Sequence, residues 1–149
     1  PLSEPALADM ARAVQARGFA VGLHSAGIYP QRLAQLLPWL DWLALDIKTD
    51  QAGYDALTGL ARSAWPVQVC LEMALEAGCA LECRTTWSPQ RLSEARLLAL
   101  AQTLAARGVR HYAVQDERSA PGQPAQGALI EAAQAQLARS FASFSYRRS

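Results

Sequence analysis

Charged and polar side chains stand at the ends of several short apolar segments, where they could form a binding site. Asp46 and Lys48 are two residues apart. In an extended strand they share one face, so we expect their charged groups to lie within reach and to stabilise each other. Together with Glu82 and Arg84, this pair suits a zwitterion such as an amino acid, because the cations fit a carboxylate and the acids fit an ammonium. Further hydrogen bonds could come from His24, His111 and Gln115. The alternative is a network of ion pairs that lines a barrel and binds no ligand.

Other kinds of site have weak support in the sequence. No G-x-S-x-G motif is present, and neither Ser25 nor Cys83 has a base beside it. Cys79 and Cys83 have the C-x-x-x-C spacing of some metal sites, but no third or fourth ligand follows at a fitting interval. We therefore interpret the three cysteines, Cys70 included, as small apolar core residues, and we expect no metal ligands in this chain.

The composition indicates a single globular domain, residues 1–149, with a substantial core. Hydrophobic residues make up 51% of the chain, and 14 basic side chains nearly balance 13 acidic ones. A net charge of +1, without a cluster of Lys and Arg, offers no surface for nucleic acid or for an anionic membrane. No apolar run approaches the roughly 20 residues of a membrane span, and the first residues do not have the pattern of a signal peptide. Three cysteines are too few and odd in number for a disulfide scaffold, so we expect a cytoplasmic protein.

Hydrophobic periodicity and turn residues predict alternating helices and strands. A first helix follows Ser3, its expected N-cap, and ends at Gly18. Strands are predicted at residues 19–25, 42–48, 80–86 and 110–115, and helices at 30–37, 50–58, 66–77, 93–106 and 128–139. Residues 116–127, rich in Pro and Gly, are predicted to be a loop, and the alternating residues 141–148 could add a strand. Such an order is typical of right-handed βαβ units and a parallel sheet.

Each predicted strand has one apolar face and one face that becomes polar toward its carboxyl end. In residues 80–86, for example, the polar face carries Glu82, Arg84 and Thr86. Open doubly wound sheets bury both faces, whereas barrel strands carry polar groups inward near their carboxyl ends. We therefore predict an α/β fold, a parallel-stranded partial (β/α) barrel of about four βα units, which is an incomplete TIM-like barrel with a cavity at its top. The alternative is that these polar groups are solvated edge residues.

Five segments, taken together and in order, resemble a known family. They are Gly18-Phe-Ala-Val-Gly-Leu-His-Ser-Ala-Gly-Ile-Tyr-Pro30, Trp42-Leu-Ala-Leu-Asp-Ile-Lys48, Tyr54-Asp-Ala-Leu-Thr-Gly59, Cys83-Arg-Thr-Thr-Trp87 and Gly108-Val-Arg-His-Tyr-Ala-Val-Gln115. The set is similar to the C-terminal part of the radical SAM activating enzymes, which activate pyruvate formate-lyase and anaerobic ribonucleoside-triphosphate reductase. The likeness covers roughly residues 1–118 and is greatest to the activating proteins of the reductase.

This resemblance implies an incomplete (β/α)6 barrel, in which a 4Fe-4S cluster binds S-adenosylmethionine and cleaves it reductively. The resulting deoxyadenosyl radical takes a hydrogen from a glycine of the partner, a glycyl radical enzyme. By position, Asp46, Lys48 and Arg84 match residues that hold the methionine moiety in the family. In the turn after the first strand, His24 replaces the more usual acid and is followed by Ser25. The end of the last strand supplies Gln115, and Thr86 shares the polar face of Arg84; all seven of these residues are candidate cofactor ligands.

The chain departs from the family in two motifs. It has neither the cluster motif C-x-x-x-C-x-x-C nor the Gly-Gly-Glu segment that precedes this region in relatives. We therefore expect this chain alone to bind no cluster and to be inactive. Because it starts at Pro1 without a Met, we expect it to be cut from a longer protein. Residues 19–25 would then form an unpaired edge strand, through which the chain is expected to self-associate.

Two other functions remain open. One is a truncated, non-catalytic barrel that acts as a binding module. The other is a decarboxylase or aldolase barrel, since D-x-K at a strand end also occurs in the orotidine phosphate decarboxylase group. That group has a second Asp three residues after the Lys, where this chain has Gln51, so the decarboxylase has the weaker support.

Overall fold

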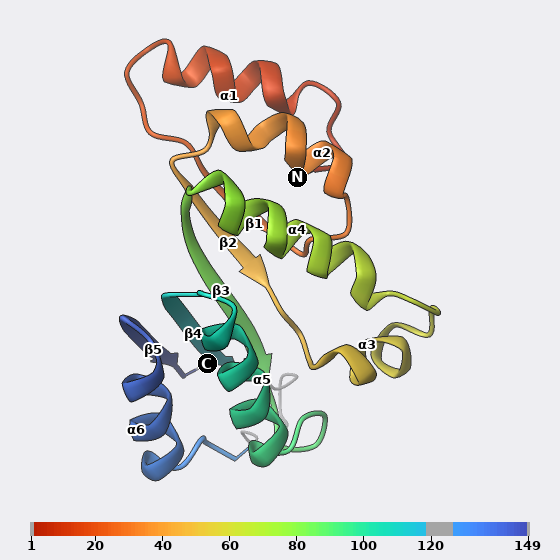
Figure 1. Ribbon diagram of the computed structural model, residues 1–149, viewed down its shortest axis with the longest axis vertical. Coiled ribbons are helices and arrows are strands. Elements are labelled where there is room, and N and C mark those ends of the chain that lie inside the picture. Colours follow the sequence, from red (N-terminus) through yellow and green to blue (C-terminus); the bar gives the residue numbers. More distant parts are fainter. Residues whose placement is uncertain (1, 119–126, 149) are drawn as a thin grey trace.

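A sheet of five parallel strands, in the order β1-β2-β3-β4-β5, organises the chain (Figure 1). We describe it from a computed structural model, in which residues 2–118 and 127–148 are placed. The strands are β1 (Gly22–Ser25), β2 (Trp42–Asp46), β3 (Ala80–Trp87), β4 (His111–Asp116) and β5 (Ser143–Arg147). The helices are α1 (Leu7–Gln15), α2 (Pro30–Leu36), the short 3-10 helix η1 (Leu37–Trp39), α3 (Gln51–Thr58), α4 (Ala64–Ala77), α5 (Glu94–Ala106) and α6 (Glu131–Ser140).

The helices pack on one face of this sheet. Because each strand pairs in parallel with the next one in the chain, right-handed connections bring every crossover back on the same side. The strand residues that point to that side form the core, and they are buried and mostly apolar: Leu23, Leu43, Leu45, Leu81, Cys83, Tyr112 and Val114. The predicted α/β fold with a parallel, partial (β/α) barrel arrangement is confirmed, and its other face is left to polar residues.

Local signals place most of the elements where the sequence predicts them. Asp50 caps α3 by accepting a hydrogen bond from the Gly53 N–H at 2.8 Å, and Ser93 caps α5 through the Arg96 N–H. Gly59 ends α3 at a φ of 70°, a left-handed conformation that glycine adopts without strain. The segment predicted to add a strand is indeed β5, with Ser143 opposite His111 on β4.

Two helix starts are wrong in the sequence prediction. Ser3 is not an N-cap, because α1 begins only at Leu7 and the Glu4 carboxylate accepts the Ala6 N–H instead. The last helix begins at Glu131 rather than residue 128, because the Leu129 N–H donates to the Tyr146 hydroxyl and holds this segment against β5. Much of the loop predicted at residues 116–127 lies outside the described residues.

Across the part of the chain that is described, none of the helices combines the length and the apolar character needed to cross a membrane.

Candidate functional site

The face of the sheet opposite the helices carries the polar side chains in rows across the strands. The strand register places His24, Ala44, Glu82, His111 and Ser143 in one row. The next row toward the carboxyl edge contains Asp46, Arg84, Ala113 and Ser145, and a third contains Thr86, Gln115 and Arg147. The predicted site residues on the strands therefore come together on this surface, which we call the open face, with the exception of Ser25.

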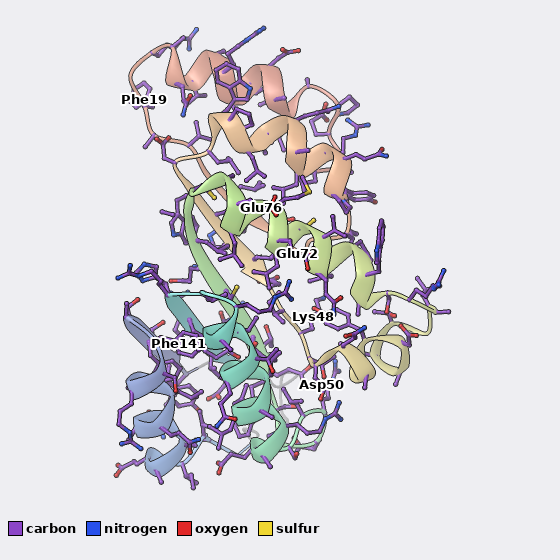
Figure 2. The ribbon with its side chains drawn as sticks, in the orientation of Figure 1. Phe19, Lys48, Asp50, Glu72, Glu76 and Phe141 are labelled. Carbon is purple, nitrogen blue, oxygen red and sulfur yellow. The ribbon has the colours of Figure 1, made fainter. Side chains whose placement is uncertain are left out.

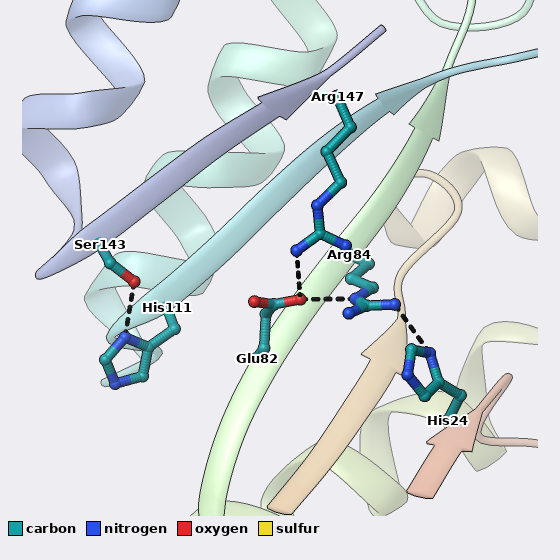
Figure 3. A network of polar contacts seen from close by, with 6 residues as sticks. All are labelled: His24, Glu82, Arg84, His111, Ser143 and Arg147. Atoms are coloured by element: carbon teal, nitrogen blue, oxygen red, sulfur yellow. Dashed lines mark hydrogen bonds and ion pairs between the residues drawn. The ribbon is translucent and has the colours of Figure 1, made fainter. Parts of the chain in front are cut away.

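A continuous polar network crosses the open face (Figure 3). Arg84 donates from Nε to Glu82 Oε1 at 2.5 Å, and its Nη1 lies 2.7 Å from His24 Nδ1. A guanidinium is only a donor, so His24 Nδ1 acts as the acceptor. Arg147 reaches the same Glu82 oxygen from β5, at 3.4 Å. Separately, His111 Nδ1 pairs with the Ser143 hydroxyl at 2.7 Å.

The long side chains of this network lie over small residues of the sheet. Ala44 and Ala113 point to the open face, yet they are only 0% and 1% exposed. The Arg84 guanidinium stacks 5.3 Å from the centre of the Trp42 ring, and the His24 ring meets the same tryptophan edge-on at 5.1 Å. These side chains thus form a layer over an alanine floor, and cation–π contact adds to the ion pairs that hold it.

Lys48 stands just beyond the end of β2 (Figure 2). Three hydrogen bonds fix the backbone there. The Ile47 N–H donates to the Arg84 carbonyl at 2.7 Å, and the Thr85 hydroxyl donates to the Ile47 carbonyl at 2.7 Å. The Lys48 N–H donates to the Tyr54 hydroxyl at 2.9 Å. Burial raises the pKa of that phenol to about 12, so it stays protonated. The chain therefore presents its lysine from a fixed position.

Asp46 is half-buried at the carboxyl end of β2. Loss of water around it raises the pKa of its carboxyl, and the positive charges of Lys48 and Arg84 counter that rise in part. Among the described residues no ion pair joins Asp46 to either cation. The charge of Lys48 nevertheless favours the ionised form of Asp46, as their spacing predicts, although β2 ends at Asp46 and the strict two-residue alternation stops there.

A cleft of about 580 Å³ opens at the carboxyl edge of the sheet next to these groups. Asp46, Lys48 and Thr86 line it, together with residues of α3, Arg96 of α5, Arg91 after β3 and Glu117 after β4. Two of these arginines are already paired, Arg91 with Glu117 and Arg96 with Asp50. The volume of this cleft lies within the roughly 300–1,000 Å³ of small-molecule sites. Lys48 also lines the cleft, and among the described residues it takes part in no ion pair.

The remaining predicted residues have different surroundings. Thr86 and Gln115 are register partners on the open face. Ser25, by contrast, is 6% exposed, and its hydroxyl accepts the Gly27 N–H at 3.0 Å, so it stabilises the turn after β1. Sequence reasoning missed Arg147 and Tyr54 as parts of the site. The alternation of residues 143–147 could have placed Arg147 on the same face, but its contact with Glu82 depends on the register.

The cysteines do not form a metal site in the described residues. Cys70 and Cys83 are buried, and desolvation raises the pKa of their thiols to about 11 and about 12. No group of three His, Cys, Asp or Glu side chains within residues 2–118 and 127–148 could hold a metal ion. Cys79 is half-buried and points toward a carbonyl of α4. These positions do not suit a 4Fe-4S cluster.

The fold is similar to that of a solved domain. The crystal structure of a domain of pyruvate-formate lyase-activating enzyme from Bacteroides vulgatus ATCC 8482 matches with a TM-score of 0.64 and 13% sequence identity, over 96% of this chain and 89% of that one. At this identity the likeness shows a shared fold alone. No family model matches the chain, and no curated protein matches it either.

Proposed function

We propose that this chain is the C-terminal part of a radical SAM activating enzyme and supplies part of the S-adenosylmethionine site with which a glycyl radical enzyme is activated. The partner is anaerobic ribonucleoside-triphosphate reductase or pyruvate formate-lyase, in the cytoplasm. The observation that carries the proposal is the charged open face, where Asp46 and Arg84 are register partners beside Lys48 at the carboxyl edge of a parallel sheet. The fold shared with a domain of an activating enzyme supports it.

The groups present fit the methionine end of S-adenosylmethionine, which carries a carboxylate and an ammonium. Lys48 and Arg84 would hold the carboxylate, since guanidinium and ammonium groups form charge-assisted hydrogen bonds to it. Asp46 would bind the ammonium, whose positive charge would compensate for the hydration that the Asp46 carboxylate loses on burial. Thr86 and Gln115, register partners on the same face, would add hydrogen bonds. His24 would orient Arg84 through their hydrogen bond.

The chemistry supplied by S-adenosylmethionine in this family is a deoxyadenosyl radical, formed when a reduced 4Fe-4S cluster cleaves it. The described cysteines do not suit such a cluster. What this chain would contribute is therefore binding and orientation: its residues hold the amino acid end of the cofactor and keep it at the carboxyl edge of the sheet.

Titration calorimetry with S-adenosylmethionine tests the proposal. We expect the chain to bind it weakly, because it contains only part of the site. Lys48→Ala should weaken binding about ten- to 150-fold, as expected for loss of a hydrogen bond to a charged group. Arg139→Ala is the matched control, since it removes one positive charge from the exposed end of α6. Equal affinity of the parent protein and the Lys48 variant would remove Lys48 from the site.

S-adenosylhomocysteine and free methionine separate this proposal from a general binding module. Both carry the same zwitterionic end, so both should compete with S-adenosylmethionine for the chain. If neither competes, the open face does not recognise that end, and the binding-module interpretation gains support instead.

A further inference from the structure

We infer that Arg147 is a positioning residue for Arg84 and acts through the carboxylate that both share, Glu82. This inference rests on the proposed function, since it concerns how Arg84 becomes available to the ligand carboxylate. In the structure as it stands, Arg84 is bonded to Glu82 on one side and to His24 on the other. A ligand carboxylate that binds Arg84 must therefore compete with Glu82.

The geometry gives Arg147 access to Glu82 across an intervening strand. Arg147 is in the row of Thr86 and Gln115, whereas Glu82 is in the row of His111. The path between them crosses β4 over Ala113, whose methyl group leaves room for a long side chain. Arg147 Nη2 ends 3.4 Å from Glu82 Oε1, the same oxygen that accepts from Arg84. One carboxylate oxygen thus joins two guanidinium groups, from β3 and β5 (Figure 3).

Burial decides what happens when Arg84 turns to a ligand. The Glu82 side chain is only 18% exposed and that of Arg84 only 19%, while Arg147 is 41% exposed. A carboxylate in such a position is costly to leave without a cation. With Arg147 in place, Glu82 keeps a partner after Arg84 has moved away from it. Without Arg147, binding of the ligand would leave Glu82 unpaired, so Arg84 would stay with Glu82 and affinity would fall.

Because Glu82 already binds Arg84, it competes with the ligand and is not one of the groups that bind it. Neutralising it should free Arg84 and remove the need for Arg147. The loss of affinity caused by Arg147→Ala should therefore occur only when Glu82 is present. Direct attraction between Arg147 and an anionic group of the ligand would instead give the same loss with and without Glu82.

Calorimetry with S-adenosylmethionine on four proteins tests the inference: the parent protein, Arg147→Ala, Glu82→Gln and the double variant. We expect Arg147→Ala to weaken binding about two- to fivefold, the range of a partly exposed ion pair. Glu82→Gln should bind at least as tightly as the parent protein. In the Glu82→Gln background, Arg147→Ala should have no further effect. Arg147→Lys should restore most of the affinity, because lysine keeps the charge that Glu82 needs.

Arg148→Ala is the matched control, because Arg148 is the exposed arginine next to Arg147 in the chain. This variant should leave affinity unchanged. An equal loss from Arg147→Ala with and without Glu82 would overturn the inference, since Arg147 would then act on the ligand directly. So would weaker binding by Glu82→Gln.

The failure of the inference and that of the proposed function can be told apart. If Lys48→Ala weakens binding but Arg147→Ala does not, only the role of Arg147 is wrong. If the parent protein binds no S-adenosylmethionine at all, the proposed function falls and this inference falls with it.

Discussion

Replacing Thr85 with Val should destabilise the fold and loosen the end of β2 at the same time. The Thr85 side chain is completely buried, and its hydroxyl makes two hydrogen bonds of 2.7 Å. It donates to the Ile47 carbonyl and accepts from the Tyr112 hydroxyl. Valine has nearly the same shape but leaves both of these buried groups without a partner.

The expected magnitude follows from those two groups. Each buried group left unpaired costs about 1–3 kcal/mol, and the new methyl group returns about 0.8 kcal/mol through burial. We therefore expect Thr85→Val to lower the free energy of unfolding by about 1–5 kcal/mol. Tyr112→Phe should cost only about 0.5–1.5 kcal/mol, because Thr85 keeps its bond to Ile47.

Urea unfolding, followed by tryptophan fluorescence, measures these differences. In the double variant, Thr85→Val with Tyr112→Phe, only the Ile47 carbonyl is unpaired, so the total cost should be smaller than the sum of the single costs. Strictly additive costs, or a cost of Thr85→Val no larger than that of Tyr112→Phe, would refute this reasoning. Because Ile47 joins Asp46 to Lys48, Thr85→Val should also weaken ligand binding, and Tyr112→Phe should not.

Three further predictions concern pH and assembly. Desolvation raises the pKa of Asp46, so ionisation of its carboxyl destabilises the fold as pH rises through that pKa. Asp46→Asn should therefore raise Tm at neutral pH and leave Tm unchanged below pH 3.8, the ordinary aspartate pKa. The pKa of Asp41 is shifted in the opposite direction, because the Val21 N–H donates to its carboxylate at 2.7 Å and lowers that pKa. Asp41→Asn should therefore lower Tm at neutral pH, and this loss of Tm should vanish as pH falls through the lowered pKa. In light scattering, the chain should associate with rising concentration through the edge strand β1. Phe19→Lys places a charge on an exposed residue just before β1 and should reduce association more than Met10→Lys on α1. Equal effects of the two variants would contradict association through β1.

The sheet and its two faces are predictable from the sequence for a physical reason. Alternation within a strand assigns each side chain to one face, so the spacing of Glu82 and Arg84 alone places them together. Helix caps such as Asp50 are also predictable, because the side chain that caps a helix is close in sequence to the groups it satisfies.

The pairing of side chains across strands is not predictable in this way. Arg147 meets Glu82 only because of the register of β4 and β5 and the small size of Ala113 between them. That Asp46 and Lys48 form no ion pair depends on the end of β2 at Asp46, and local patterns place a strand end only approximately. The bond from Leu129 to Tyr146 delays the start of α6 and likewise joins residues far apart in the chain.

Chemical-shift mapping by NMR, with S-adenosylmethionine added to the labelled chain, tests the central claim most directly. The account predicts that the largest shifts fall on the carboxyl edge of the open face, at residues such as Asp46, Lys48, Arg84 and Thr86. Shifts confined to the helix side of the sheet, for instance at the exposed Trp65 of α4, would contradict it, and so would an unchanged spectrum.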